Sequence, residues 1–235
     1  MGRVLIVACG LSYPTAFSEG DMNVYKVALV AAVAGLASGC ANLERSRDTA
    51  NHDVSGQTLA QQVCSNCHGI TGNSRSPEFP NLAAQQQDYI VAQLQGFKAH
   101  SREDPPGPEY MWGLSHNLTD KQITELATYF SEQKLAREPR ESNPERIEAG
   151  RAIFIGGIPD KGVPACATCH GPQGLGNATI PRIAGQHVRY LIRQLTVFQH
   201  TNERPAGTAM KAVAHNLSRE NMEIVAACVQ ALTNR

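Results

Sequence analysis

The sequence is poor in aromatic side chains. Phe, Tyr and Trp make up 6% of its 235 residues, and there is a single Trp. This supply is lean for two separate hydrophobic cores. Either the chain forms one modest core, or a bound macrocycle supplies part of the apolar bulk.

The sequence also lacks a surplus of charge of either sign, since 21 Lys and Arg residues balance 21 Asp and Glu residues. Without a basic surplus the chain cannot neutralise many phosphates, which argues against nucleic acid as a partner. A content of 42% hydrophobic and 18% charged residues is typical of a globular protein rather than a disordered one.

No hydrophobic run is long enough to read as a full membrane span. The apolar stretch from Val27 to Ala37 is short, follows Lys26 and ends in small residues, which predicts a secretory signal within residues 1–40. Met22 is the expected start of that signal.

The signal ends in "LASGC", which resembles the lipobox of bacterial lipoproteins. This predicts lipidation of Cys40 and an anchor in a membrane, with ordinary signal cleavage as the alternative. The polar residues 41–54 are expected to form a tether.

The odd number of cysteines, seven, argues against a pure disulfide framework. Four of them form two matching clusters, Cys64-x-x-Cys67-His68 and Cys166-x-x-Cys169-His170. Cys-x-x-Cys-His is the attachment pattern of c-type haem, in which two thiols bond the porphyrin and the adjacent imidazole binds the iron. The sequence therefore predicts two covalently attached haem c groups.

Two other interpretations of the clusters are weaker. A zinc site built from the Cys pairs would leave both histidines unexplained, and the pairs fall in separate repeats. A thioredoxin-like redox pair needs a βαβ context that the pattern lacks.

An internal repeat sets the domain organisation. "FPNLAAQQQDYIVAQLQGF" (79–97) matches "IPRIAGQHVRYLIRQLTVF" (180–198), and "MWGLSHNL" matches "MKAVAHNL". The repeat predicts a first haem domain over 55–138, a linker over 139–147 and a second haem domain over 148–235.

Each repeat is expected to be helical, which makes the fold class all-α. Residues 57–63 and 89–97 carry apolar side chains at helical spacing. A further helix begins at the capping box of Thr119 and Gln122, and its counterpart begins at Ser218. The apolar residues of these last two helices recur at helical intervals: Ile123, Leu126, Ala127 and Phe130 in the first, and Met222, Val225, Ala226 and Val229 in the second.

The second axial ligand of each iron decides what a haem can do. The candidates are Met111, His100 and His116 in the first repeat, and Met210, His200 and His215 in the second. Met111 aligns with Met210, but His116 also aligns with His215, so the repeat alone leaves a bis-histidine site open.

The order Cys-x-x-Cys-His, Pro, Met and a capped last helix, twice over, resembles the cytochrome c4 family of dihaem cytochromes. The resemblance covers about residues 55–235 and implies two tandem class-I cytochrome c domains with Met111 and Met210 as axial ligands. It also implies that the backbone carbonyls of Pro80 and Pro181 accept hydrogen bonds from the two proximal imidazoles.

The resemblance implies a periplasmic electron carrier, not an enzyme, because both axial positions are filled. The expected donor is a bc-type complex or a periplasmic dehydrogenase, and the expected acceptor is a haem–copper terminal oxidase. The alternatives are the dihaem subunit of a flavocytochrome sulfide dehydrogenase or a dihaem enzyme such as a peroxidase or thiosulfate dehydrogenase.

Charge is divided unequally between the repeats. Residues 41–140 hold nine Lys and Arg against twelve Asp and Glu, whereas residues 141–235 hold ten against seven. We expect this asymmetry either to favour docking of the halves and of partners, or to reflect only a solvated surface. Cys228, outside the clusters, is expected to be a buried free thiol, with an intermolecular disulfide as the alternative.

Overall fold

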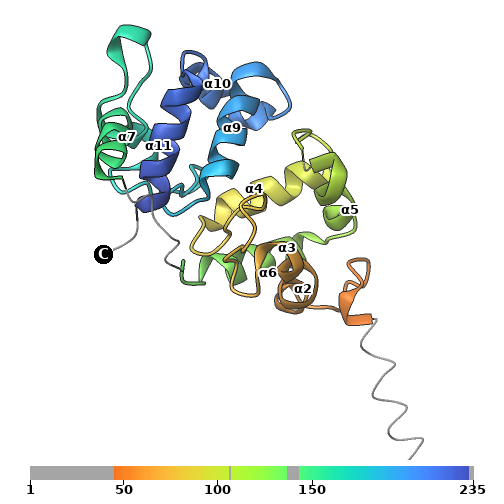
Figure 1. Ribbon diagram of the computed structural model, residues 1–235. Coiled ribbons are helices and arrows are strands. Elements are labelled where there is room, and N and C mark those ends of the chain that lie inside the picture. Colours follow the sequence, from red (N-terminus) through yellow and green to blue (C-terminus); the bar gives the residue numbers. More distant parts are fainter. Residues whose placement is uncertain (1–44, 106, 137–142, 233–235) are drawn as a thin grey trace, which may run out of the picture. The chain divides into compact units, whose positions relative to one another are not determined.

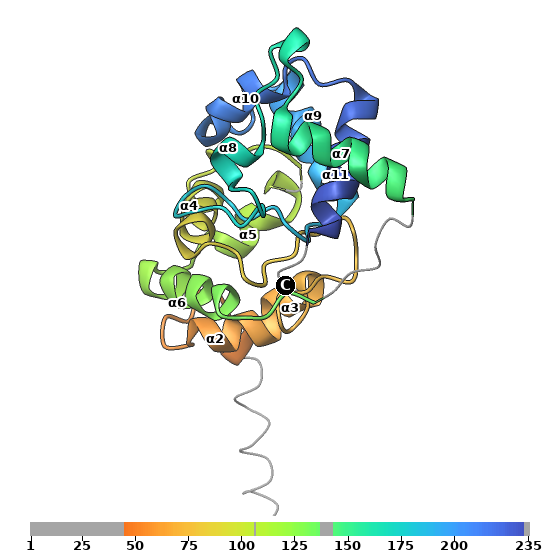
Figure 2. The same ribbon diagram turned by 90° about the vertical axis from the view of Figure 1, so that its left-hand side faces the viewer.

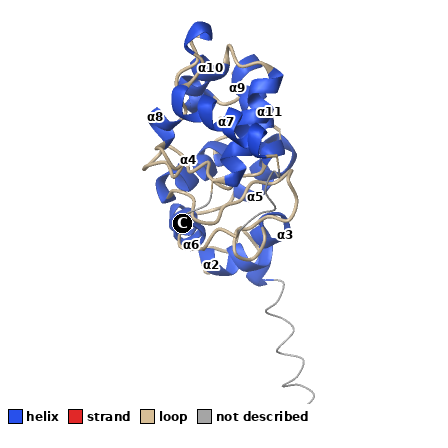
Figure 3. Ribbon diagram, turned by 60° about the vertical axis from the view of Figure 1, so that its left-hand side comes forward, coloured by secondary structure: helices blue, strands red, loops and turns tan. Residues whose placement is uncertain are grey.

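The computed structural model describes residues 45–105, 107–136 and 143–232. The predicted signal and Cys40 lie outside these residues, as does part of the predicted linker. Over the described part, helices are joined by loops, and the only β pairing is two isolated bridges, Ile158 with Val163 and Asn177 with Ile180 (Figure 3). The expectation of an all-α fold is confirmed.

Each half of the sequence forms its own set of helices (Figure 1). The first half contains the elements η1 (Arg45–Arg47), α2 (Gly56–Leu59), η2 (Ala60–Cys64), α3 (Ser65–His68), α4 (Gln87–Lys98), η3 (Gly107–Met111), α5 (Trp112–Ser115) and α6 (Asp120–Ser131). The second half contains α7 (Pro144–Gly156), η4 (Pro159–Lys161), α8 (Ala167–His170), α9 (Val188–His200), η5 (Pro205–Gly207), α10 (Thr208–Ala214) and α11 (Arg219–Ala231).

The predicted helix starts are present. The Thr119 side chain accepts from the N–H of Gln122, whose Oε1 accepts from the N–H of Thr119 at 3.0 Å. Ser218 and Asn221 make the same reciprocal contact at the start of α11. The eight apolar residues predicted for these two helices are all buried.

The first and last helices of each half pack against each other at a glycine. In the first half, a Cβ on Gly56 of α2 would lie 2.5 Å from Cβ of Glu125 on α6. In the second half, a Cβ on Gly150 of α7 would lie 2.7 Å from Cβ of Cys228 on α11 and would also collide with the Ile224 carbonyl. Figure 2 shows α7 lying across α11.

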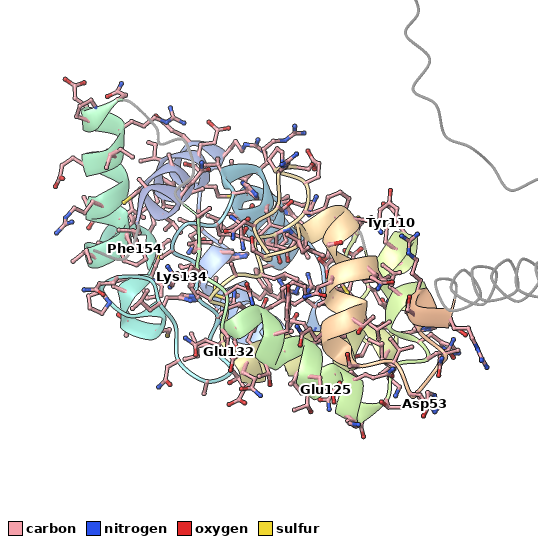
Figure 4. All side chains as sticks on the ribbon, turned by 90° about the horizontal axis from the view of Figure 1, so that it is seen from below. Asp53, Tyr110, Glu125, Glu132, Lys134 and Phe154 are labelled. Atoms are coloured by element: carbon pink, nitrogen blue, oxygen red, sulfur yellow. The ribbon has the colours of Figure 1, made fainter. Side chains whose placement is uncertain are left out.

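Phe154 projects from α7 in Figure 4, is 1% exposed, and belongs to a core cluster with Val225 and Val229 of α11. Burial of the Phe154 side chain contributes about 2 kcal/mol to the stability of this half. Glycine at position 150 is required because it allows the two backbones to approach closely enough for this contact.

The chain differs from the sequence-based expectation at both edges of the first half. α7 begins at Pro144, inside the predicted linker, with Asn143 as its N-cap. Residues 45–54 were expected to be a tether, yet Gln122 Nε2 donates to the carbonyls of Asn51 and Val54 at 3.0 and 2.9 Å. This contact fixes the end of the segment on α6. None of the described helices combines the length and the apolar character needed to cross a bilayer.

Candidate haem sites and the junction between the halves

Both Cys-x-x-Cys-His clusters form a single helical turn. In the first half, Cys64 precedes α3, which contains Cys67 and ends at His68; in the second, Cys166 precedes α8, which ends at His170. The next residue is a glycine with positive φ, 75° at Gly69, which stops the helix there. The turn thus holds two thiols and one imidazole close together in each half.

The imidazole of each cluster is buried and held by a backbone carbonyl. His68 Nδ1 lies 2.9 Å from the carbonyl oxygen of Pro80, and His170 Nδ1 lies 2.8 Å from that of Pro181. Because a carbonyl oxygen only accepts, Nδ1 must carry the proton in both rings. The Nε2 lone pair is therefore left for a metal ion, and the contact with the two prolines is the one that the family resemblance implied.

Burial keeps these groups neutral. It lowers the pKa of His68 and of His170, against a smaller opposing effect of the hydrogen bonds to Pro80 and Pro181. Burial also raises the pKa of the Cys64 thiol to about 12 and that of Cys166 to about 11. Each cluster therefore presents a neutral imidazole, which is the form that binds iron.

The donor set of each half fits a covalently attached haem. None of Cys64, Cys67, Cys166 and Cys169 is in a disulfide, so all four thiols can bond a porphyrin. Within the described residues, no group of three or more His, Cys, Asp or Glu side chains is placed to hold a metal ion, and the two Cys pairs lie in separate halves. Haem supplies the one-electron chemistry of iron, and the protein sets how strongly each oxidation state is favoured.

The candidates for the second axial position differ in exposure. His100, His116, His200 and His215 are exposed, whereas Met111 and Met210 are half-buried. Met111 lies at the junction of η3 and α5, and Met210 lies in α10.

Aromatic contacts link the segment that carries Met111 to the proximal site of the first half. The His68 ring meets Phe79 edge-on at 6.1 Å between centroids, and Phe79 meets Tyr110 at 6.2 Å. Tyr110, labelled in Figure 4, directly precedes Met111. Trp112, on the other side of Met111, stacks on His100 at 4.2 Å and donates from Nε1 to the Arg102 carbonyl at 2.8 Å. Trp112 therefore fixes the junction of η3 and α5 that carries Met111.

One matched pair of glutamines lies where the two halves meet. Gln85 and Gln186 each bond the backbone of the opposite half, Gln85 at Arg182 and Gln186 at Asn81. The match between the repeats identified both glutamines as part of a duplication. It did not show that each glutamine contacts the other half. A polar residue that is identical in two otherwise different copies is a signal from which such a contact could have been suspected.

A buried charge cluster lies at the same junction. Asp104 is fully buried, and its carboxylate accepts from Arg102 at 2.8 and 3.2 Å and from Gln194 of α9 at 3.1 Å. Arg204 of the second half lies 3.8 Å from it. Burial alone would raise the pKa of Asp104, but the hydrogen bond from Arg102 and the charges of both arginines outweigh burial and hold that pKa below its usual value.

The second half also contacts this cluster from the side of Arg204. Its guanidinium donates to Gln93 Oε1 at 2.9 Å, to the Tyr89 hydroxyl at 3.1 Å and to Gln194. Beside it, the backbone N–H of Glu103 donates to the Glu203 carbonyl at 2.8 Å. Since Glu103-Asp104-Pro105 and Glu203-Arg204-Pro205 are matching tripeptides, opposite charges occupy equivalent places in the two repeats.

A second ion pair has the same polarity. Glu78 of the first half contacts Arg189 at 2.7 Å and Arg193 at 3.2 Å, both on α9. Among the described residues, the ion pairs that join the halves all put an acid of the first half against an arginine of the second. This supports the expectation that the unequal charges favour docking of the halves.

Comparison with known proteins identifies the family. The cytochrome c family model matches the chain twice, over residues 54–134 and 147–233. Cytochrome c4 from Stutzerimonas stutzeri is 39% identical over 181 residues, which cover 72% of this chain and 84% of the relative. The crystal structure of reduced recombinant cytochrome c4 from Pseudomonas stutzeri superposes with a TM-score of 0.67 at 38% identity, covering 76% of this chain and 97% of the other.

A more distant relative is the thiosulfate dehydrogenase electron acceptor of Thiomonas intermedia. It is 31% identical over 139 residues, which cover 58% of this chain and 62% of the relative. The two matches to the family model, the similarity to cytochromes c4 and the matching clusters lead to one conclusion. The chain belongs to the cytochrome c family as a two-domain protein of the cytochrome c4 type, which carries two covalently bound haem c groups and transfers electrons between redox partners instead of catalysing a reaction.

Proposed function

We propose that the protein shuttles electrons in the periplasm through two six-coordinate haems. Cys64 and Cys67 would bond the first porphyrin, with His68 and Met111 as axial ligands. Cys166 and Cys169 would bond the second, with His170 and Met210 as axial ligands. The domains that hold them would be residues 55–138 and 148–235, and α7 of the second half would begin inside the linker 139–147 that joins them.

The observation that carries this proposal is the matched pair of hydrogen bonds from His68 and His170 to the carbonyls of Pro80 and Pro181. Each bond fixes the ring orientation and leaves Nε2 for iron. The half-burial of Met111 and Met210, against the exposure of the four candidate histidines, favours thioether ligation on the other side. Such ligation raises the reduction potential relative to a bis-histidine haem.

The protein's own residues would then act in three ways. The buried imidazoles of His68 and His170 would hold the irons, the thioethers of Met111 and Met210 would fill the remaining coordination position, and the surrounding helices would exclude water. With no open position left for a substrate, the haems would supply one-electron transfer to a docked partner. We propose a bc-type complex or a periplasmic dehydrogenase as the donor and a haem–copper oxidase as the acceptor.

A second candidate donor is favoured by one observation. The Thiomonas intermedia relative is named an electron acceptor of thiosulfate dehydrogenase, which is a dehydrogenase of the proposed donor class.

The role of electron-accepting subunit of a flavocytochrome sulfide dehydrogenase stays an alternative. Co-purification with a flavoprotein would support that alternative. Lipidation of Cys40 would hold the carrier at a membrane.

Separate variants Met111→Ala and Met210→Ala test the axial ligands. Each variant should lose half of the weak far-red absorption band of the oxidised protein, and its reduced form should bind one equivalent of carbon monoxide. Met222→Leu is the matched control, because Met222 is a buried core residue of α11. An unchanged band in either alanine variant would contradict ligation by that methionine.

A further inference from the structure

In the second half, hydrogen bonds run from the proximal imidazole through one peptide group to the opposite half. His170 Nδ1 donates to the Pro181 carbonyl at 2.8 Å. The N–H of the same peptide group belongs to Arg182, and it donates to Oε1 of Gln85 at 2.7 Å. Gln85 lies in the first half, just before α4.

The first half has the reciprocal arrangement. His68 Nδ1 donates to the Pro80 carbonyl at 2.9 Å, and the N–H of that peptide group, on Asn81, donates to Oε1 of Gln186 at 2.8 Å. Gln186 lies in the second half, just before α9. Each proximal imidazole is thus one peptide group away from a glutamine of the other half.

The orientation of both side-chain amides is determined by their surroundings. Gln85 Oε1 also accepts from the N–H of Gln86 at 2.9 Å, while Nε2 donates to the Arg182 carbonyl at 2.9 Å. For Gln186, Oε1 accepts from the N–H of His187 at 3.1 Å, and Nε2 donates to the Asn81 carbonyl at 3.0 Å. A flipped amide would put its NH2 group against two N–H donors and its oxygen against a carbonyl.

The two glutamines are 7% and 6% exposed, so water does not compete freely for these bonds. An acceptor at the N–H of a peptide group polarises that group and makes its carbonyl oxygen a stronger acceptor. A stronger acceptor draws the Nδ1 proton and makes the imidazole a more basic ligand. A more basic ligand favours ferric over ferrous iron.

We infer that Gln85 and Gln186 are positioning residues that lower the reduction potential of the haem in the opposite half. The inference rests on the proposed ligation of iron by His68 and His170. Docking of the two halves would then affect the reduction potentials of both haems as well as the stability of the protein. Separating the halves would break both series of hydrogen bonds.

The effect should be crossed. In the dihaem protein, Gln85→Met should shift the reduction equilibrium of the second-half haem towards the ferrous state by about two- to tenfold, the effect expected of one hydrogen bond. Tenfold corresponds to 59 mV for one electron. Gln186→Met should do the same to the first-half haem. Methionine keeps the length of the side chain but has no amide.

Gln86→Met is the matched control. Gln86 neighbours Gln85 and also bonds across the junction, from Nε2 to the Leu175 carbonyl at 2.8 Å, but its side chain makes no bond to a peptide group held by a proximal histidine. Loss of the Gln86 amide should weaken docking of the halves but should not shift the reduction potential of one haem relative to the other.

The readout is a redox titration of isotope-labelled protein that is monitored by NMR. In the reduced state, the Nδ1 proton of each histidine reports the strength of its own bond to proline. Gln85→Met should move the His170 proton upfield and leave that of His68 in place, and Gln186→Met should do the reverse. Shifts within the variant's own half, equal shifts in both halves, or no shift would overturn the inference.

Failure of the proposed ligation would look different. The Nδ1 protons would then not follow the redox state of any haem, even in the unmodified protein. Should the variants fail to fold, the unmodified protein still decides. The amides of Asn81 and Arg182 should exchange slowly and show scalar coupling to the side-chain carbonyl carbons of Gln186 and Gln85. Fast exchange without coupling would also overturn the inference.

Discussion

Replacing Asp104 by Asn should weaken the contact between the halves. The change removes one negative charge and leaves the shape almost unaltered. It leaves Arg102 and Arg204, whose side chains are 10% and 8% exposed, without a carboxylate to balance them. Two buried positive charges then face each other across the junction.

The magnitude follows from burial and geometry. Asp104 accepts two hydrogen bonds from Arg102, at 2.8 and 3.2 Å, and has no exposed surface. Breaking such a buried pair typically costs about 3–5 kcal/mol, since the remaining charge stays desolvated. We expect the free energy of unfolding in urea to fall by about that amount at neutral pH.

The pH dependence gives a second readout. The pKa of Asp104 is held below that of an unfolded aspartate, so its contribution to stability is complete above the unfolded pKa. It is lost as the pH falls through the lower, folded pKa. Asp104→Asn should therefore flatten the decline in stability at acidic pH as well as lowering stability at neutral pH.

Glu132→Gln is the control for this experiment. Glu132 is the exposed C-cap residue that follows α6 (Figure 4), where loss of a charge should change stability by no more than about 0.5 kcal/mol. A neutral-pH loss for Asp104→Asn that matches the control, or an unchanged decline in acid, would refute the role assigned to this carboxylate.

Three further changes test other parts of the structure. Gly150→Ala should lower the free energy of unfolding by about 1–3 kcal/mol, because the new Cβ would collide with α11. Gly156→Ala, in the same helix, is the control, since its Cβ would meet nothing within 4 Å and should not destabilise the protein. Equal effects of the two changes in denaturation would contradict the close helix contact. Cys228, whose pKa is raised by burial, should resist a thiol reagent at pH 7 in the folded dihaem protein and react once it is unfolded, and labelling of the folded protein would show that the thiol is open to solvent. If the unequal charges of the halves steer docking of a partner, raising the ionic strength should slow electron transfer to that partner in stopped-flow measurements. An unchanged rate would rule out that steering.

The chemistry of the sites was predictable from the sequence because it depends on local spacing. Two thiols and a histidine within one helical turn act together whatever surrounds them, and Cys64 to His68 could be recognised without a fold. The capping boxes at Thr119 and Ser218 and the apolar faces that follow them are equally local. Both capping boxes are present, and the eight apolar residues that follow them are buried.

The junction could not be predicted, because it depends on how two helical units meet. Asp104 and Gln85 are polar residues next to loops, which the sequence places on a surface. Only the packed structure shows that Asp104 is fully buried and that Gln85 contacts Arg182, 97 residues away. The matching positions of Asp104 and Arg204 carried a hint, since opposite charges at equivalent places in a repeat suit a contact between the copies.

The most direct test of the account is the ligation of both irons in the unmodified protein. The oxidised spectrum should show the far-red band of Met–Fe(III) ligation at two equivalents per chain, and the reduced protein should bind no carbon monoxide. One equivalent or none, or binding of carbon monoxide, would mean that at least one haem is open or held by histidine, which would contradict a carrier with two closed haems.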